Sequence, residues 1–189
     1  MIILGACSES EAPEPVSDDP DSFIIADVRL FDGFEVHTNK TVTVVDGLIQ
    51  SIDDAGTVAS NLRRIDGEGK TLMPGLMDAH THTQAAEQLH ETLRWGVTTV
   101  FDMATADSTA AMLREKAEAR PDIAGFFSAV QVATVPEGHG TQYGRPVPTL
   151  TKPDEAAAFV DARFTEGSDY LKILMAGARA REVGAIRRW

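Results

Sequence analysis

The fold is decided by the stretch Met73-Pro74-Gly75-Leu76-Met77-Asp78-Ala79-His80-Thr81-His82. A Pro-Gly turn leads into an apolar strand, 76–82, that ends on two histidines. Side chains alternate between the two faces of a strand, so His80 and His82 point the same way and Thr81 points the opposite way. Two imidazoles on one face can chelate a divalent metal such as Zn2+. Solvated surface histidines are the alternative, but a pair at the end of a strand that opens a βα series favours a metal site.

The chain beyond this stretch alternates between helical and strand patterns. Helices are expected at 85–95, 108–120 and 153–164, and strands at 97–101, 123–130 and 169–175. A long loop rich in glycine and proline separates the strand at 123–130 from the last helix. Counting 76–82, four strands alternate with helices, which indicates βα units on a parallel sheet.

A small sheet is expected before the histidine strand, over residues 23–72. Residues 23–30 are β-rich, and the β-branched run 41–45 is followed by Asp46-Gly47 and a second strand-like run, 48–52. Asp-Gly between two such runs is a strong signal for a two-residue hairpin turn.

The first 22 residues read as a remnant lipoprotein signal and a disordered acidic tether. Leu4-Gly5-Ala6-Cys7 resembles the lipobox at which bacterial lipoproteins are cut and lipidated, and 8–22 is too rich in Ser, Pro, Glu and Asp to bury a core. A chance tetrapeptide is the alternative, because only three residues precede the box. A lipidated Cys7 would attach the protein to a membrane in the bacterial periplasm or cell envelope; an unprocessed chain would be cytoplasmic.

Composition narrows the class of partner. The net charge of -12 argues against nucleic acid, which needs a basic surface. The single cysteine excludes an intramolecular disulfide and a Cys-rich zinc site. A small-molecule substrate is the simplest expectation.

The segment 73–82 closely resembles the signature that begins the barrel of the amidohydrolase superfamily, whose members include imidazolonepropionase- and prolidase-like metal-dependent hydrolases. Residues 26–28 and 46–49 look like that superfamily's N-terminal β-sandwich, and 96–100 looks like its second barrel strand. The resemblance implies an α/β fold: the first half of a (β/α)8 TIM barrel, about four βα units over 73–175, preceded by a partial small β-sandwich. It implies that His80 and His82 bind metal at the active-site face of the barrel.

Lys172 is the third candidate ligand, within the apolar run of the expected fourth strand. Its surroundings, 167–173, are similar to the pattern in which binuclear members of the superfamily carry a carboxylated lysine that bridges two metals. A lysine in an apolar run is costly unless it is paired or modified. A salt-bridged or snorkelling lysine at the strand end is the alternative.

Weaker candidates surround these three residues. His139 and Tyr143 lie on the loop after the third barrel strand, where barrel enzymes place substrate-contacting groups, although an ordinary flexible loop is as good an explanation. Asp102, just after the second strand, could orient a ligand histidine, and Asp78 could do the same; a structural role is at least as plausible for both acids.

The expected function is that of a metal-dependent amidohydrolase, which hydrolyses non-peptide or cyclic C-N bonds with metal-activated water. Residues 73–189 would hold about half of a roughly 250-residue barrel, and by resemblance the missing half carries two more histidines and a general-base aspartate. We therefore expect a truncated, inactive chain with an aberrant tail at 176–189. The alternatives are a non-catalytic lipoprotein remnant or half-barrel that needs a partner, and a mononuclear deaminase-type member with unmodified Lys172.

Overall fold

The computed structural model describes residues 16–58, 60–144 and 146–174. The chain separates into two compact units, Met1–Pro74 and Gly75–Trp189. Cys7 and the tail at 176–189, to which the predictions of a lipid anchor and an aberrant ending refer, lie outside the described residues. In the described part of the chain we find no helix with the length and apolar character that a membrane crossing requires.

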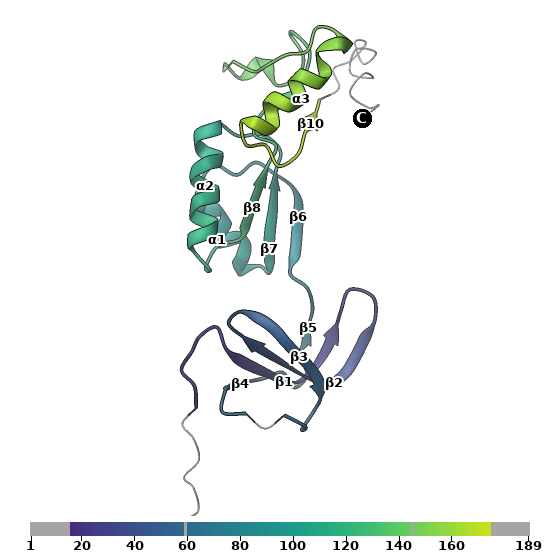
Figure 1. Ribbon diagram of the computed structural model, residues 1–189, viewed down its shortest axis with the longest axis vertical. Helices are drawn as coiled ribbons and strands as arrows, with labels where there is room; N and C mark the ends of the chain where they lie inside the picture. The colour runs from purple at the N-terminus through teal and green to yellow at the C-terminus, as the bar shows by residue number, and fades with distance from the viewer. Residues whose placement is uncertain (1–15, 59, 145, 175–189) are drawn as a thin grey trace, which may run out of the picture. The chain divides into compact units, whose positions relative to one another are not determined.

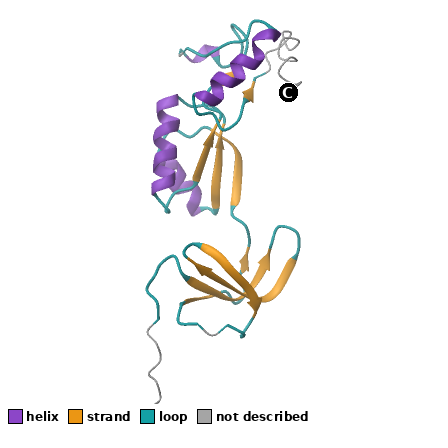
Figure 2. Cartoon of the chain, viewed as in Figure 1, coloured by secondary structure: helices purple, strands orange, loops and turns teal. Residues whose placement is uncertain are grey.

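The first unit is one mixed sheet (Figure 2). Its strands are β1 (Phe23–Phe31), β2 (Val36–Val45), β3 (Leu48–Asp54), β4 (Arg63–Asp66) and β5 (Thr71–Leu72). They run in the order β3-β2-β1-β4, and β5 also pairs with β1. The expected hairpin is confirmed: β2 and β3 are antiparallel, and Asp46 and Gly47 turn between them with φ of 51° and 75°. The described residues form a single layer here, so the two-layered character of a sandwich is not seen in them.

The last residues of the segment predicted as a disordered tether form hydrogen bonds within the first unit. The Ser17 N–H donates to the Asn61 carbonyl at 2.8 Å, and the Gly47 N–H donates to the Asp21 carbonyl at 2.8 Å. Ser22 is buried, and its hydroxyl accepts a hydrogen bond from the Asp46 N–H. These hydrogen bonds join Ser17, Asp21 and Ser22 to the loop before β4 and to the turn between β2 and β3, even though these residues contribute little apolar surface.

The second unit begins with two βα units and a third strand, as the sequence predicts. The elements are β6 (Leu76–Thr81), α1 (Ala86–Arg94), β7 (Val97–Asp102), α2 (Asp107–Ala119) and β8 (Gly125–Ser128). The three strands are parallel in the order β6-β7-β8, and both helices lie on the same side of them (Figure 1). Gly96, with φ of 83°, follows the end of α1, and Pro121 prevents α2 from continuing.

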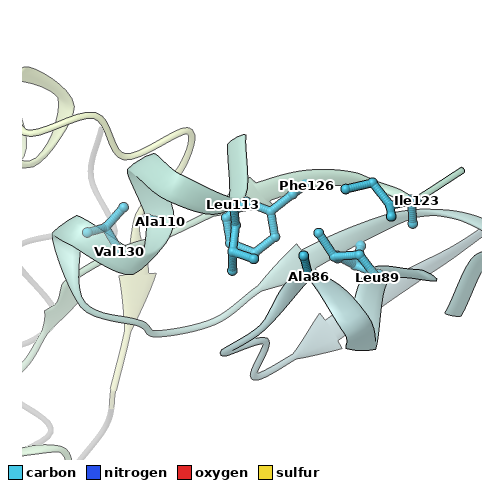
Figure 3. Packing of buried hydrophobic residues seen from close by; sticks show 9 residues of the cluster. Ala86, Leu89, Ala110, Leu113, Ile123, Phe126 and Val130 are labelled. Carbon is cyan, nitrogen blue, oxygen red and sulfur yellow. The ribbon is translucent and has the colours of Figure 1, made fainter. Parts of the chain in front are cut away.

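The core of this unit lies between the helices and the sheet (Figure 3). Leu89 of α1 and Leu113 of α2 are fully buried and pack with Val100 and Phe126 of the strands. The next residues along β7 and β8 point to the other face of the sheet, where Phe101 and Phe127 stack with ring centroids 5.6 Å apart. Phe127 is 44% exposed. Apolar residues on both faces are typical of parallel strands that are meant to be covered on both sides.

The expected fourth strand is present but does not join β8. The remaining elements are β9 (Val132–Ala133), the 3-10 turns η1 (Thr141–Tyr143) and η2 (Pro153–Glu155), α3 (Ala156–Thr165) and β10 (Lys172–Ile173). Strand β10 pairs in parallel with β9, in a separate two-stranded sheet. Two local features explain this correction. Val130, with φ of 55°, bends the chain after β8, and the Ser128 N–H donates to the Asp169 carboxylate instead of to a neighbouring backbone. The described residues therefore contain parallel β-α units without a closed barrel.

Candidate metal and substrate site

The two histidines lie at the C-terminal end of β6. Their ring centroids are 5.7 Å apart, and both side chains are exposed. The Asp78 carboxylate accepts a hydrogen bond from the His80 N–H at 3.0 Å and so braces the backbone of this strand end. His82 Nδ1 lies 3.5 Å from the Ala104 carbonyl oxygen. Because a carbonyl only accepts, a hydrogen bond across this long distance would have its proton on Nδ1 and would leave the Nε2 lone pair of His82 for a ligand.

A cavity of about 640 Å³ opens beside these histidines. It brings together five of the residues that the sequence singles out: His80, His82, His139, Tyr143 and Lys172. The remaining lining residues are Gln84, Met103, Ala104, Thr105, Ala106, Val132, Gly140, Val147 and Leu174. No aspartate or glutamate is among these described lining residues, although the chain has a net charge of -12. The wall is largely apolar, and its polar groups are imidazoles, hydroxyls, one amide and one lysine.

Lys172 reaches the cavity from β10. Its side chain is partly buried, and its backbone pairs with that of Val132. Within the described ranges it forms no salt bridge, so the salt-bridged alternative is not seen there. Its carboxylation, and its role as a metal ligand, remain predictions.

His139 and Tyr143 lie on the loop between β9 and α3. Their rings meet edge to face with centroids 6.1 Å apart. The Gln142 amide lies between them in the sequence and contacts His139 Nδ1 at 3.1 Å. The loop is therefore hydrogen-bonded at the position of His139, and the substrate-binding role of both residues remains a prediction.

Asp102 is not among the lining residues; it is fully buried beside the cavity. Its carboxylate accepts hydrogen bonds from the Thr83 N–H at 2.9 Å and from the Ser128 hydroxyl at 2.6 Å. The Ser128 oxygen in turn accepts from the Val130 N–H at 2.9 Å. These bonds connect the C-terminal ends of β6, β7 and β8, which supports the structural role. Orientation of a ligand histidine by Asp102 remains a prediction.

Three supporting residues were not identified from the sequence: Gln142, Ser128 and Tyr170. The Tyr170 hydroxyl donates to the Asp102 carbonyl at 2.6 Å and contacts the Phe127 carbonyl at 3.2 Å. Burial, together with the charges of Asp102 and Asp169, raises the pKa of Tyr170 above its ordinary range. For Gln142 the sequence does offer a local signal, because it lies three residues after His139 within a turn that is flanked by glycines.

The side chains present are compatible with part of a divalent metal site. Two imidazoles that converge from one strand end, with a lysine in the same cavity, suit a borderline metal such as Zn2+. The described ranges contain no group of three or more His, Cys, Asp or Glu side chains placed to hold a metal ion. The histidines therefore stand as a pair, and a complete coordination sphere would need further ligands.

Comparison with known proteins gives consistent matches. No family model matches the chain. The imidazolonepropionase of Halobacterium salinarum is 40% identical over 57 residues, which are 27% of this chain and 14% of that protein. A crystal structure of a candidate prolidase from Bifidobacterium longum superposes with a TM-score of 0.66 at 27% identity, over 84% of this chain and 42% of that one.

A Xaa-Pro dipeptidase with methionine bound in its active site also superposes, with a TM-score of 0.66 at 24% identity, over 83% of this chain and 48% of that one. The chain thus spans less than half the length of each of these matched proteins. Its β-rich first unit, its parallel β-α units and its paired histidines at a strand end agree with these similarities. The chain resembles part of the amidohydrolase superfamily, in particular its prolidase- and imidazolonepropionase-like proteins.

Proposed function

We propose that the chain supplies metal- and substrate-binding parts of the active site of a metal-dependent amidohydrolase that hydrolyses C-N bonds of small molecules. The observation that carries this proposal is the convergence of His80, His82 and Lys172 on one cavity at the C-terminal ends of parallel strands. Ligands of open α/β sheets and of α/β barrels bind at this end. Cyclic amides, imidazolone-like rings and dipeptides are the candidate substrates, because the matched proteins include an imidazolonepropionase and a Xaa-Pro dipeptidase.

The histidines would hold the metal through their imidazole nitrogens. A bound divalent ion would supply Lewis acidity, which polarises a substrate carbonyl and activates water. The residues of this chain would do the positioning. The Ala104 carbonyl turns the Nε2 lone pair of His82 outward, and Asp78 fixes the backbone at His80. The apolar wall residues, such as Val132 and Leu174, would exclude water from the bound substrate.

Lys172 is proposed as a carboxylated ligand. The neutral amine would attack carbon dioxide, form an N–C bond and release one proton, which gives an anionic carbamate with two oxygen donors. In the mononuclear, deaminase-type alternative the amine stays unmodified. Incubation with 13C-bicarbonate separates the two: a carbamate carbon signal that is present in the wild type and absent from Lys172→Arg supports carboxylation. Identical spectra from the two proteins, recorded with Zn2+ present, would refute it.

Metal binding by the chain itself tests the proposal. In a Co2+ titration followed by visible absorption, His80→Ala and His82→Ala should each weaken binding at least tenfold, since even the hydrogen-bonding partners of metal ligands are worth about 10- to 100-fold. His90→Ala is the matched control, because His90 is an exposed histidine of the same unit that does not line the cavity and contacts the Asp122 carbonyl at 2.8 Å. Equal Co2+ affinity in all three variants would contradict a metal site at the end of β6.

A second candidate function is a binding half-barrel that needs a partner to supply further βα units. It is favoured by the open side of β6, which pairs only with β7 among the described strands and exposes 51% of Leu76 and 67% of Met77. Sedimentation of the purified chain with Zn2+ distinguishes the two ideas. A monomer that hydrolyses a dipeptide or cyclic amide, with loss of that activity in His80→Ala, would rule out the need for a partner.

A further inference from the structure

The Gln142 side chain lies between the backbone of Gly140 and the ring of His139. Gln142 Oε1 accepts a hydrogen bond from the Gly140 N–H at 2.6 Å, and Gln142 Nε2 lies 3.1 Å from His139 Nδ1. A backbone N–H can only donate, so the amide atom that faces Gly140 must be the oxygen. The NH2 group therefore faces His139, and because it too can only donate, Nδ1 must be the acceptor. A neutral His139 ring held in this way carries its proton on Nε2.

The backbone of the loop keeps this arrangement in place. Gly140 has φ of 105°, a conformation that residues with a side chain rarely adopt, and a Cβ at this position would lie only 3.2 Å from side-chain atoms of Val132 and Leu174. The Thr134 hydroxyl donates to the His139 carbonyl at 2.9 Å. The Tyr143 ring packs edge-on against the His139 ring. Both neighbours of the Gln142 amide are thus fixed independently of the amide itself.

The proton on Nε2 gives His139 a role that differs from that of the other two cavity histidines. A metal ligand must offer a lone pair, as His82 does through Nε2. His139 has its Nδ1 lone pair occupied by Gln142, and within the described residues its Nε2 has no hydrogen-bond partner. No described aspartate or glutamate lines the cavity to take up this donor. Because His139 is exposed, this N–H is open to an oxygen acceptor of a ligand that enters the cavity.

We propose that Gln142 is a positioning residue that holds His139 in the Nε2–H tautomer, so that His139 donates a hydrogen bond to a carbonyl or carboxylate oxygen of the ligand in the cavity. The ligand part of this inference rests on the proposed function, in which the cavity binds substrate. The tautomer part does not, because the hydrogen bonds that fix it lie within the loop.

Nitrogen-15 NMR of the histidine rings tests the tautomer directly. Long-range 1H-15N spectra of the metal-free chain, recorded at about pH 9 where imidazole is neutral, should show protonated Nε2 and bare Nδ1 for His139, assigned from the signals lost in His139→Ala. Gln142→Glu keeps the size of the side chain but presents only acceptors, so it should reverse the tautomer to Nδ1–H. Gln84→Glu is the control: it adds the same charge at another residue that lines the cavity, and it should leave the His139 tautomer unchanged. A wild-type Nδ1–H tautomer, or an unchanged tautomer in Gln142→Glu, would overturn the proposal.

The donor role is tested with two small probes. Acetate and neutral acetamide, titrated into the same samples, should shift the His139 Nε2–H signal in the wild type and in Gln84→Glu. In Gln142→Glu both probes should bind about tenfold more weakly, since the Nε2–H donor of His139 is replaced by a lone pair. Acetamide is neutral, so a weaker affinity for acetamide reports loss of the His139 donor and not repulsion by the charge that Gln142→Glu adds. A reversed tautomer with unchanged acetamide affinity would overturn the donor role. Because no metal is present, failure of the Co2+ experiment above would not affect either result.

Discussion

Replacing Asp102 with asparagine is the most direct test of how the strand ends are held. The two carboxylate oxygens accept one hydrogen bond from the Thr83 N–H and one from the Ser128 hydroxyl, at a side chain that is 0% exposed. Asparagine has a single oxygen, so its NH2 group must face one of these two donors, which then stays buried without that partner. Hydrogen bonds to charged groups contribute about 1.5–3 kcal/mol, and a buried donor without a partner costs about 1–3 kcal/mol. We expect Asp102→Asn to lower the free energy of unfolding of the second unit by about 2–3 kcal/mol.

Tryptophan fluorescence in urea measures this change in the second unit alone, because both tryptophans of the chain, Trp95 and Trp189, belong to it. Asp161→Asn is the matched control, an exposed aspartate on α3 for which we expect a change within about 0.5 kcal/mol. Far-ultraviolet circular dichroism should show that both variants are folded before urea is added. If the unfolding free energies of the two variants agree within about 0.5 kcal/mol, the buried hydrogen bonds of Asp102 do not hold the strand ends together.

Three further predictions concern the core and two titratable groups. Leu113→Ala, at a fully buried position between α2 and the sheet, should lower the unfolding free energy by about 2–5 kcal/mol in the same fluorescence assay. In Tyr143→Phe the only remaining tyrosine is Tyr170, whose pKa is raised by burial, so the absorbance of tyrosinate should appear only above the ordinary pKa of about 10. The folded chain holds this proton more tightly than the unfolded chain, so stability should be lost as the pH rises past that value. A titration midpoint near 10 would contradict the raised pKa. Hydrogen bonds, of which that from the backbone N–H of Glu35 is the strongest, lower the pKa of Asp32 to about 2. The stabilising effect of the Asp32 carboxylate should therefore be present at neutral pH and lost between about pH 4 and pH 2. Carboxyl 13C NMR should find the low titration midpoint, and Asp32→Asn should abolish the loss of stability over this pH range.

Much of the fold could be predicted because its signals are local. Asp46-Gly47 specifies a turn with two positive φ angles, and the structure has a hairpin there. Gly96 and Pro121 end the first two helices where the sequence suggests. Alternation along β6 predicts that His80 and His82 share a side, and both line one cavity. Each of these inferences needs only the geometry of a few neighbouring residues.

The partner of β10 and the support of the cavity could not be predicted in the same way. Pairing of β10 with β9 depends on the positive φ of Val130, a β-branched residue for which that conformation is unusual. The role of Ser128 depends on a contact with Asp102, 26 positions earlier in the chain. Such contacts follow from the packed structure as a whole, and no periodicity of a single sequence encodes them.

Residues next to His82 and near Lys172 are hydrogen-bonded to the same buried residue, Asp102, although His82 and Lys172 lie 90 positions apart in the chain. Thr83, next to His82, donates to the Asp102 carboxylate, and Tyr170, two residues before Lys172, donates to the Asp102 carbonyl. A change in the Asp102 side chain acts on the first of these bonds and leaves the second, which involves the backbone, in place. If Asp102 positions the metal ligands, Asp102→Asn should therefore weaken Co2+ binding through His82 while the environment of Lys172 stays as it is. A loss of stability with unchanged Co2+ affinity would instead mean that the end of β6 is held by the strand itself.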